Sequence, residues 1–593
     1  MKSEDNIWCS IDIETSSQNR YACTVDRVCF SEFDIKTGDI IFEWDTSFRE
    51  GRFNDWFGWK GLGTQCHIAK NIVMHNASFD LYILEHRLKV KVKGTVHDTM
   101  LMAKHYKNDL PSYSLKNLSW MLFGDTYQCL LDLREWLYEN KLPGEDDIEF
   151  DMTLPPDEMV HKYCLHDVHQ TAKLATFFYP TVAENYAYQM DTECIRLNMD
   201  MEVNGITVDV PYLKKFSQLG VRRIRRNKKQ ASELLGVDKG RSPTGHALRD
   251  HLTELGETDK TKTDMTKSDE ATLRKWRDDD AVRAVERIRT DQKLVNTYAK
   301  NILSVVNKEG MFHPNMMQSA AVTRRYRSQS MYSDDGTITK GNVQNLPRGP
   351  GIRTAFIVPP GFKFVKIDLA SIEARLGANA MSVFLGEDWF SEQYRKSDKF
   401  NIYLHVVKEC TGHGNVSKKD NIYQAYKHGC LGVQYGVGID TFHKTLTDKF
   451  ALPYSKQECG NIYQTIRKKF PVFSALQRTV SNIIASRGYI LDDFGAVYYV
   501  PRSEQYKGVN YYCQGCAGNV LKWWWIELDK LLKGNDDRIF LCVHDEFDVA
   551  VKKDRGARKR VKSYCDTLKG LDVFTLPIVA EASGLCDNWA ECG

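Results

Sequence analysis

Asp545 and Glu546 stand next to each other between two apolar, β-prone runs near the C-terminus, in the stretch 538–551. The second run alternates apolar with other side chains, which predicts a half-buried strand and hence a hairpin with carboxylates at its bend. Adjacent carboxylates in a buried turn repel each other unless a cation or a solvated cleft receives them. Hard oxygen ligands suit Mg²⁺ or Mn²⁺, and two such ions about 3.5–4 Å apart can clamp the oxygens of phosphoryl transfer. Taken alone, the stretch fits an ordinary β-turn with surface acids better, so the chemistry depends on partner residues elsewhere.

Asp368 is the candidate partner, because it ends a second apolar strand over residues 362–368. A helix follows this strand, with Ser371 as its candidate N-cap. Strands that end in Asp368 and Asp545 can bring acids from distant parts of the chain to one two-metal centre.

A helix predicted between these two strands carries Lys427, Leu431 and Tyr435 on one face, at i, i+4 and i+8. That face offers a cation, an apolar wall and an aromatic ring. Gly429 and Gly432 each cost a helix about 1 kcal/mol relative to Ala, which indicates close approach by something flat. An amphipathic core helix is the alternative interpretation.

A second group of acids lies in the N-terminal third. Each member alone is more often a helix cap or a surface acid, but their spacing predicts that several share one site. The group consists of Asp12 and Glu14 on one face of a strand over residues 6–14, Asp80 at a helix start after an apolar strand, and Tyr163 and Asp167 four apart on a helix over residues 158–178.

The 593 residues are enough for about three to five domains. No apolar stretch approaches the roughly 20 residues of a membrane helix, and the start of the chain shows no secretory signal, so we expect a cytoplasmic protein. Sixteen cysteines are too sparse for a disulfide scaffold and predict reduced thiols. The single Cys-x-x-Cys, at Cys513 and Cys516, lacks the second pair typical of zinc sites.

The net charge of +3 is small, but its distribution matters more than its sum. Six basic residues fall within positions 222–229 of a helix predicted over 221–235, which suits either a phosphate backbone or a solvated face. The polar residues 256–270 predict a mobile loop between helices. Farther along, side chains that can donate to minor-groove acceptors predict sequence-independent duplex contacts. They are Arg325, Asn342, Gln344 and Asn345.

The N-terminal acids, in this order, resemble the proofreading 3′-to-5′ exonuclease domain of the type with Asp, Glu, Asp, Asp and a tyrosine, over about residues 5–190. The resemblance implies that Tyr163 orients the water that attacks the terminal phosphodiester. Lys162 stands where histidine-type relatives have His, which favours the tyrosine type, and His161 and His166 have no assigned role. The implied metal ligands are Asp12, Glu14, Asp80 and Asp167.

The three C-terminal motifs are similar to motifs A, B and C of family A (DNA polymerase I-like) DNA polymerases, from about residue 196 to Trp589. The resemblance implies an α/β exonuclease domain with a ribonuclease H-like mixed sheet. It also implies a right-hand polymerase domain with an α+β palm and helical fingers and thumb. The expected divisions are 1–195 exonuclease, 196–320 thumb and palm entry, 321–389 palm first part, 390–500 fingers, and 501–593 palm second part.

The same resemblance implies roles for single residues. Asp368 and Asp545 would hold two Mg²⁺ or Mn²⁺ ions, with help from the Leu369 carbonyl and with Glu546 as an auxiliary acid. In the fingers, Lys427 would bind the triphosphate, Tyr435 would stack near the templating base, and Leu431 would face the sugar. Glu373 would exclude a ribose 2′-hydroxyl. The positions implied to hold primer and template are Arg325, Asn510, Gln514 and His544.

Several positions depart from the family pattern. Tyr423 replaces the usual fingers arginine, with Lys419 one turn earlier as a candidate substitute. Leu431 stands in place of Phe or Tyr, and Arg324 in place of Gly in the usual Thr-Gly-Arg. Tyr506 replaces another family arginine. These departures suggest a divergent, phage-type enzyme.

The sequence therefore predicts template-directed DNA synthesis with proofreading, at two Mg²⁺ or Mn²⁺ ions per active site. Expected partners are primer-template DNA and dNTPs, with helicase-primase and single-strand binding protein as possible accessory proteins, and the chain is expected to be a monomer. A single-subunit RNA polymerase is an alternative that leaves the N-terminal acids and Glu373 unexplained. A catalytically silent primer-template binding factor is a second alternative.

Overall fold

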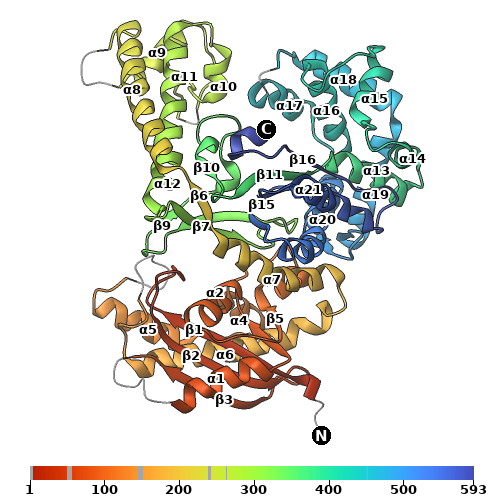
Figure 1. Cartoon of the computed structure of the whole chain (residues 1–593). Helices are drawn as coiled ribbons and strands as arrows, with labels where there is room; N and C mark the ends of the chain where they lie inside the picture. Colours follow the sequence, from red (N-terminus) through yellow and green to blue (C-terminus); the bar gives the residue numbers. More distant parts are fainter. Residues whose placement is uncertain (1–3, 50–55, 144–150, 238–241, 262, 451) are drawn as a thin grey trace.

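The computed structural model describes residues 4–49, 56–143, 151–237, 242–261, 263–450 and 452–593. An N-terminal α/β part lies below a larger part in which two groups of helices flank antiparallel sheets (Figure 1). None of the helices in the described residues combines the length and the hydrophobicity that a bilayer crossing requires.

The N-terminal part is built on a five-stranded mixed sheet of order β3-β2-β1-β4-β5. β1 pairs antiparallel with β2 and parallel with β4. Two apolar clusters cover the two faces, because alternate residues of β1 point to opposite sides: Trp8 to one, Cys9 and Ile11 to the other. The strands are β1 (Ile7–Thr15), β2 (Val25–Asp34), β3 (Ile40–Ser47), β4 (Asn71–Met74) and β5 (Thr95–Asp98). The helices are α1 (Trp56–Ile68), α2 (Ser78–Tyr82), α3 (Thr99–Tyr106), α4 (Leu115–Phe123), α5 (Gln128–Glu139) and α6 (Asp157–Val182).

Helix α7 (Tyr186–Asn204) joins the two parts of the molecule. Ile195 and Met199 pack into the N-terminal core, whereas Leu197 and Met201 pack into the large core of the C-terminal part. The division expected between residues 195 and 196 therefore falls inside one continuous helix that serves both cores.

The C-terminal part contains two larger antiparallel sheets and a two-stranded one. The first has the order β10-β6-β7-β8-β9, and the second, which we call the palm sheet, has the order β14-β15-β11-β16. Strands of the first sheet are β6 (Ile206–Val208), β7 (Met311–Met317), β8 (Arg327–Tyr332), β9 (Ile338–Lys340) and β10 (Phe356–Ile357). Strands of the palm sheet are β11 (Phe362–Leu369), β14 (Arg538–Val543), β15 (Glu546–Lys552) and β16 (Ala580–Ala582), and the small sheet pairs β12 (Tyr489–Leu491) with β13 (Val497–Tyr499).

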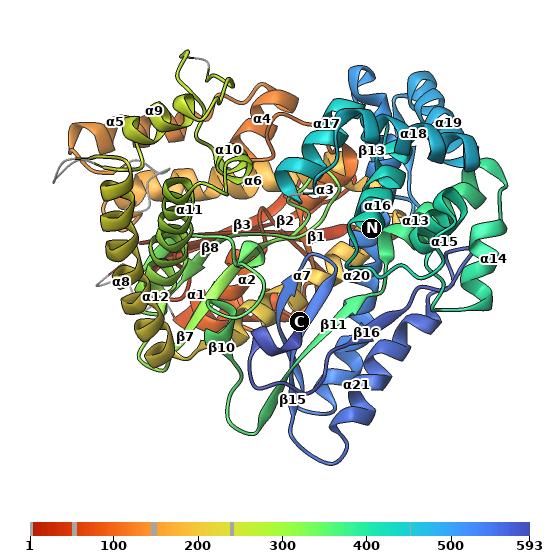
Figure 2. The same cartoon turned by 90° about the horizontal axis from the view of Figure 1, so that it is seen from above.

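Two helical groups stand on either side of the palm sheet, as the thumb and fingers of a right hand do (Figures 1 and 2). The thumb group has a small apolar core of its own between its helices. It contains α8 (Val210–Leu234), α9 (His246–Glu254), α10 (Glu270–Lys275), α11 (Asp280–Gln292) and α12 (Lys300–Val305). The fingers group contains α13 (Ile372–Leu385), α14 (Trp389–Lys396), α15 (Ile402–Thr411), α16 (Asn421–Gln434), α17 (Ile439–Lys444), α18 (Lys456–Lys469) and α19 (Pro471–Arg487). Two further helices, α20 (Gly508–Lys533) and α21 (Ala557–Asp566), lie against the palm.

Some local predictions differ from the structure. The basic helix predicted over 221–235 begins much earlier, at Val210, because Asp209 caps it and Pro211 suits its first turn. Ser371 does precede α13, but the prediction that its side chain caps the helix was wrong: its φ is 52° and it forms no cap hydrogen bond. The loop over 256–270 contains a short bridge between Lys260 and Thr266.

Candidate active sites

The N-terminal acids meet between β1 and α6. β1 presents Asp12 and Glu14 to the face that α6 covers, where the Cys164 thiol lies 3.6 Å from Asp12 Oδ2. The ligand atoms of Asp12, Glu14 and Cys164 all lie within 4.8 Å of one another. Asp80 comes from α2 and Asp167 from α6, and both are buried. The structure therefore confirms the predicted strand and helices.

The charges of this group are unbalanced. Burial raises the pKa of Asp12 well above its usual range, and repulsion from Asp167 adds to the shift. The pKa values of Glu14 and Asp80 are raised well above normal for the same two reasons, with Asp12 as the repelling neighbour. Among the described residues, none donates a hydrogen bond to Asp167 Oδ1. A buried acid group of this kind is suited to a cation.

Lys116 on α4 is a site residue that the sequence interpretation missed. Its ammonium donates a hydrogen bond to the hydroxyl of Tyr163 and lies 4.9 Å from the centre of the Tyr163 ring. Its charge also lowers the pKa values of Asp12, Glu14 and Asp167, although burial outweighs this effect. A single lysine in a helix carries no sequence signal, so only the fold could reveal it.

The C-terminal acids meet at one end of the palm sheet. β11 and β15 are antiparallel neighbours in which Asp368 stands opposite Glu546. Asp545 lies in the turn between β14 and β15, and its carbonyl oxygen accepts a hydrogen bond of 3.1 Å from the Leu369 N–H. The predicted hairpin and strand are confirmed, and all three acids lie at the same edge.

Burial raises the pKa values of Asp368, Asp545 and Glu546. Several cations oppose this shift, Arg348 and Arg353 among them. Arg325 lies 3.0 Å from Asp545, and Lys366, which sequence reasoning missed, lies 3.8 Å from Asp368 and 3.6 Å from Glu546. Lys366 is two residues before Asp368 on the same strand face, and this alternation is the signal that could have identified it.

Helix α16 carries Lys427 and Leu431, and Tyr435, the third residue predicted for this face, directly follows its last residue. Lys427 and Leu431 are partly exposed, whereas the Tyr435 hydroxyl is buried. The flat group that approaches Gly432 belongs to the protein itself, and the atoms nearest to Gly429 are those of Ile466 and Ile462. A Cβ on Gly432 would lie 2.0 Å from the Tyr463 hydroxyl on α18. This contact is the tight helix packing of the core-helix alternative.

The residues predicted to contact DNA have different surroundings. Gln514 donates a hydrogen bond of 2.7 Å to Glu373, which holds both side chains in place. Gln344 is buried; its amide oxygen accepts from the Ser328 N–H and its amide nitrogen donates to the Cys542 carbonyl, so the predicted DNA contact does not fit this side chain. Partly or fully exposed positions are Asn342, Asn345, Asn510 and His544.

Two departures from the family pattern have local explanations. Arg324 adopts a φ of 59°, the left-handed backbone for which glycine is best suited, and its guanidinium donates to the Val497 carbonyl at 2.7 Å. Tyr423 is buried and its hydroxyl accepts a hydrogen bond of 3.3 Å from Asn401, while Lys419 is exposed just before α16. Tyr423 therefore packs in the interior and does not replace the charge of the family arginine.

A cavity of about 760 Å³ lies between the N-terminal sheet and strands β7 to β9. Glu14 reaches it from one side, and Lys104, Arg327 and Lys340 line it with positive charge. The cavity thus extends from the N-terminal acids toward the C-terminal part.

Comparisons with known proteins agree with this geometry. A family model described as "DNA polymerase family A" matches residues 210–591, and one described as "3'-5' exonuclease" matches residues 9–183. DNA polymerase I of Helicobacter pylori (strain ATCC 700392 / 26695) is 25% identical over 482 residues, 77% of this chain and 50% of that protein. DNA polymerase I of Pseudomonas aeruginosa is 23% identical over 561 residues, 88% of this chain and 56% of that protein.

A solved structure, the POL domain of Pol1 from M. smegmatis in complex with DNA primer-template and dNTP, has the same fold. The TM-score is 0.76 at 17% identity, covering 99% of this chain and 96% of the other. The chain spans about half the length of the Helicobacter relative. Because the family A model matches most of the chain, including the whole palm sheet, the chain belongs to DNA polymerase family A, and it carries a 3'-5' exonuclease domain.

Proposed function

We propose that the protein is a template-directed DNA polymerase that extends a primer 3′ end with dNTPs and removes mispaired ends with its exonuclease site. One observation carries this proposal: two separate groups of acids, buried in the N-terminal part and partly buried in the palm, stand on two different sheets, each beside a lysine or arginine. A template-binding factor without catalysis would not need either group.

Divalent metal ions fit both groups of acids, because desolvation and repulsion between neighbouring acids raise the pKa values of Asp12 and Asp545 despite the cations beside them. We propose two Mg²⁺ or Mn²⁺ ions at each site. Bound ions would stabilise charge on the attacking and leaving oxygens of phosphoryl transfer. The holding residues would be Asp368, Asp545 and the Leu369 carbonyl in the palm, and Asp12, Glu14, Asp80 and Asp167 in the exonuclease site.

In the palm, the protein's own side chains would position the incoming nucleotide and the primer end and neutralise the charge of the triphosphate. Lys427 would contact the triphosphate of the incoming nucleotide, and Tyr435 would lie beneath the templating base. Glu373, held by Gln514, would exclude a 2′-hydroxyl because a fixed side chain leaves no space for it. Glu546 would act as an auxiliary acid, and the exposed His544 would hold the primer end with Asn510.

In the exonuclease site, burial raises the pKa of Tyr163 well above its usual range, so the hydroxyl stays protonated. Lys116 donates to the hydroxyl oxygen, and the Tyr163 O–H, which faces the Asp167 carboxylate, would turn to donate to the attacking water. The cavity lined by Lys104 and Lys340 would guide a frayed strand to these residues. We also propose the expected domain divisions, except that the first boundary lies within α7. A phage-type origin, a cytoplasmic location and the replication accessory partners are part of the same proposal.

Primer extension with Mg²⁺ tests the proposal. We expect Asp545→Ala to abolish dNTP addition while DNA binding persists, and Asp12→Ala to abolish 3′-end degradation while extension persists. Unchanged extension by Asp545→Ala would refute the catalytic assignment, and loss of both activities in Asp12→Ala would refute two separate sites. Equal use of rNTPs and dNTPs would favour an RNA polymerase.

A further inference from the structure

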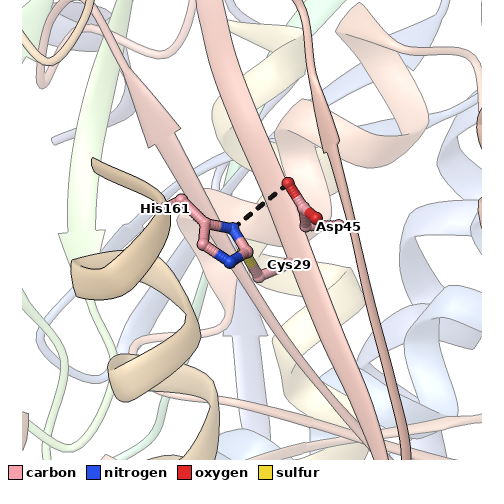
Figure 3. Close-up of side chains that lie close together, drawn as sticks. All are labelled: Cys29, Asp45 and His161. Carbon is pink, nitrogen blue, oxygen red and sulfur yellow. Dashed lines mark ion pairs between the residues drawn. The ribbon is translucent and has the colours of Figure 1, made fainter. Parts of the chain in front are cut away.

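A group of metal-ligating side chains lies on the N-terminal sheet, next to the exonuclease acids. Cys29 on β2 stands between two cross-strand partners, Asp12 on β1 and Asp45 on β3. The ligand atoms of Cys29, Asp45 and His161 all lie within 4.8 Å of one another, and Figure 3 shows the His161 ring beside both partners. These residues belong to three different elements, β2, β3 and α6.

A second cysteine lies between this group and the exonuclease acids. Cys164 lies three residues after His161 on α6, a spacing that puts both on one helix face. Its sulfur packs against Cys29, and its thiol donates to the carbonyl oxygen and to Oδ2 of Asp12 at 3.5 and 3.6 Å. His161 Nδ1 is 3.3 Å from Asp45 Oδ2, and both cysteines are completely buried.

We propose that Cys29, Asp45, His161 and Cys164 form a structural zinc site. Two sulfurs, one imidazole and one carboxylate are a tetrahedral donor set for Zn²⁺, with bonds of about 2.3 Å to sulfur and about 2.0–2.2 Å to nitrogen and oxygen. Mg²⁺ disfavours thiolate ligands, so this site would select a different metal from the neighbouring carboxylates. Each thiol releases its proton when the ion binds. Burial of both sulfurs leaves no position for a substrate, so the ion would be structural.

Arg27 provides the positive charge that a zinc ion with two thiolates and one carboxylate lacks. Its guanidinium now pairs with Asp45 and Asp157 and lies 3.4 Å from His161 Nδ1. Zinc binding requires Asp45 to exchange Arg27 for the metal, while Arg27 keeps its 2.6 Å contact with Asp157. Two thiolates and one carboxylate exceed the charge of Zn²⁺ by one unit, and the adjacent Arg27 supplies the compensating positive charge.

A zinc ion there would tie α6 to β2 and β3. α6 also carries Tyr163 and Asp167, so the ion would fix the helix from which the exonuclease site is built. This role is distinct from the proposed catalysis, because none of Cys29, Asp45 and His161 belongs to the proposed catalytic set.

The test uses the full chain, stripped with a chelator and kept in millimolar Mg²⁺ so that the carboxylate sites are occupied. Titration with Co²⁺ should give one equivalent of tetrahedral cobalt with sulfur-to-metal charge-transfer absorption, and one equivalent of Zn²⁺ should displace it. Cys29→Ser and Asp45→Asn should each lose this absorption and the tightly held zinc. Primer extension reports that each variant is folded.

Three matched variants serve as controls. His169→Gln changes a histidine on the same helix that pairs with Glu43 of β3 at 2.9 Å. Cys66→Ser removes a buried thiol elsewhere in the same domain, and Cys513→Ser disrupts the Cys-x-x-Cys. All three should retain the cobalt spectrum. Absorption that survives in Cys29→Ser and Asp45→Asn, or a wild-type chain that retains no zinc, would overturn the proposal and leave only an ion-pair network around Arg27.

Discussion

Arg325 lies 3.0 Å from the carboxylate of Asp545, the residue proposed to hold metal in the palm. The guanidinium therefore partly neutralises this acid. Because a metal ion and the guanidinium compete for the same negative charge, binding of the ion favours release of Arg325 toward the primer or template. The ion pair thus connects loading of the palm site with DNA contact.

The first prediction concerns this ion pair. Arg325→Gln removes the competing charge, so extension should reach half its maximal rate at a roughly twofold to fivefold lower Mg²⁺ concentration, as expected for a partly exposed pair worth about 0.4–1 kcal/mol. Primer-template affinity should fall in the same variant. Arg327→Gln, two residues further along on β8, is the control. A higher Mg²⁺ requirement in Arg325→Gln would contradict the competition.

The second prediction concerns Lys116. Lys116→Gln should lower the exonuclease rate by about 10-fold to 100-fold, the cost of a lost charge-assisted hydrogen bond of about 1.5–3 kcal/mol. Lys116 lowers the pKa values of Asp12, Glu14 and Asp167, so its removal should move the acid limb of the exonuclease pH profile to higher pH.

Primer extension by Lys116→Gln should be unchanged, and Lys162→Gln, next to Tyr163 on the solvent side of α6, is the control. A rate loss without a displaced pH profile would mean that Lys116 supports the fold only.

The third prediction concerns the sugar of the incoming nucleotide. Leu431 has no hydroxyl that could replace the interactions of a missing 3′-hydroxyl, so the wild-type enzyme should use dideoxynucleotides poorly. Leu431→Tyr should increase their incorporation relative to dNTPs by about 10-fold or more, the value of one hydrogen bond to a polar partner. Single-nucleotide extension kinetics measure this ratio, with Leu431→Met as the apolar control. Efficient termination by the wild type would refute the interpretation of Leu431.

The sequence could predict those parts of the fold and sites that short-range patterns specify. Asp368 lies near the end of one apolar strand and Asp545 follows another, so periodicity predicted their place at a sheet edge, and the resemblance added the roles of single residues. The sequence did not identify Lys116 as a site residue, because its partner Tyr163 is distant in the chain. Gln344 was misjudged because exposure is a tertiary property, and its buried amide serves the backbone of β8 and β14. For Gly432, the pattern indicated a close approach but could not distinguish a nucleotide base from Tyr463.

The last prediction concerns acid stability of the N-terminal part. Burial lowers the pKa of His97 to about 3, and its ring is held neutral between Tyr188 at 2.8 Å and Asn71 at 3.2 Å. The unfolded chain takes up a proton below pH 6.5 that the folded chain does not. Stability is therefore full above pH 6.5 and falls by about 1.4 kcal/mol per pH unit as pH drops from there toward 3.

The urea concentration at which half of the N-terminal part is unfolded should fall between pH 7 and pH 4.5. Hydrogen exchange of the amides in β4 and β5 measures this midpoint. In His97→Asn the slope should be smaller, even if the variant is less stable at pH 7 because it loses stacking on Trp8. His67→Asn, at an exposed position of α1, should keep the wild-type slope. Equal slopes in wild type and His97→Asn would mean that the folded protein accepts a proton at His97, since only a folded state that excludes the proton links this side chain to acid unfolding.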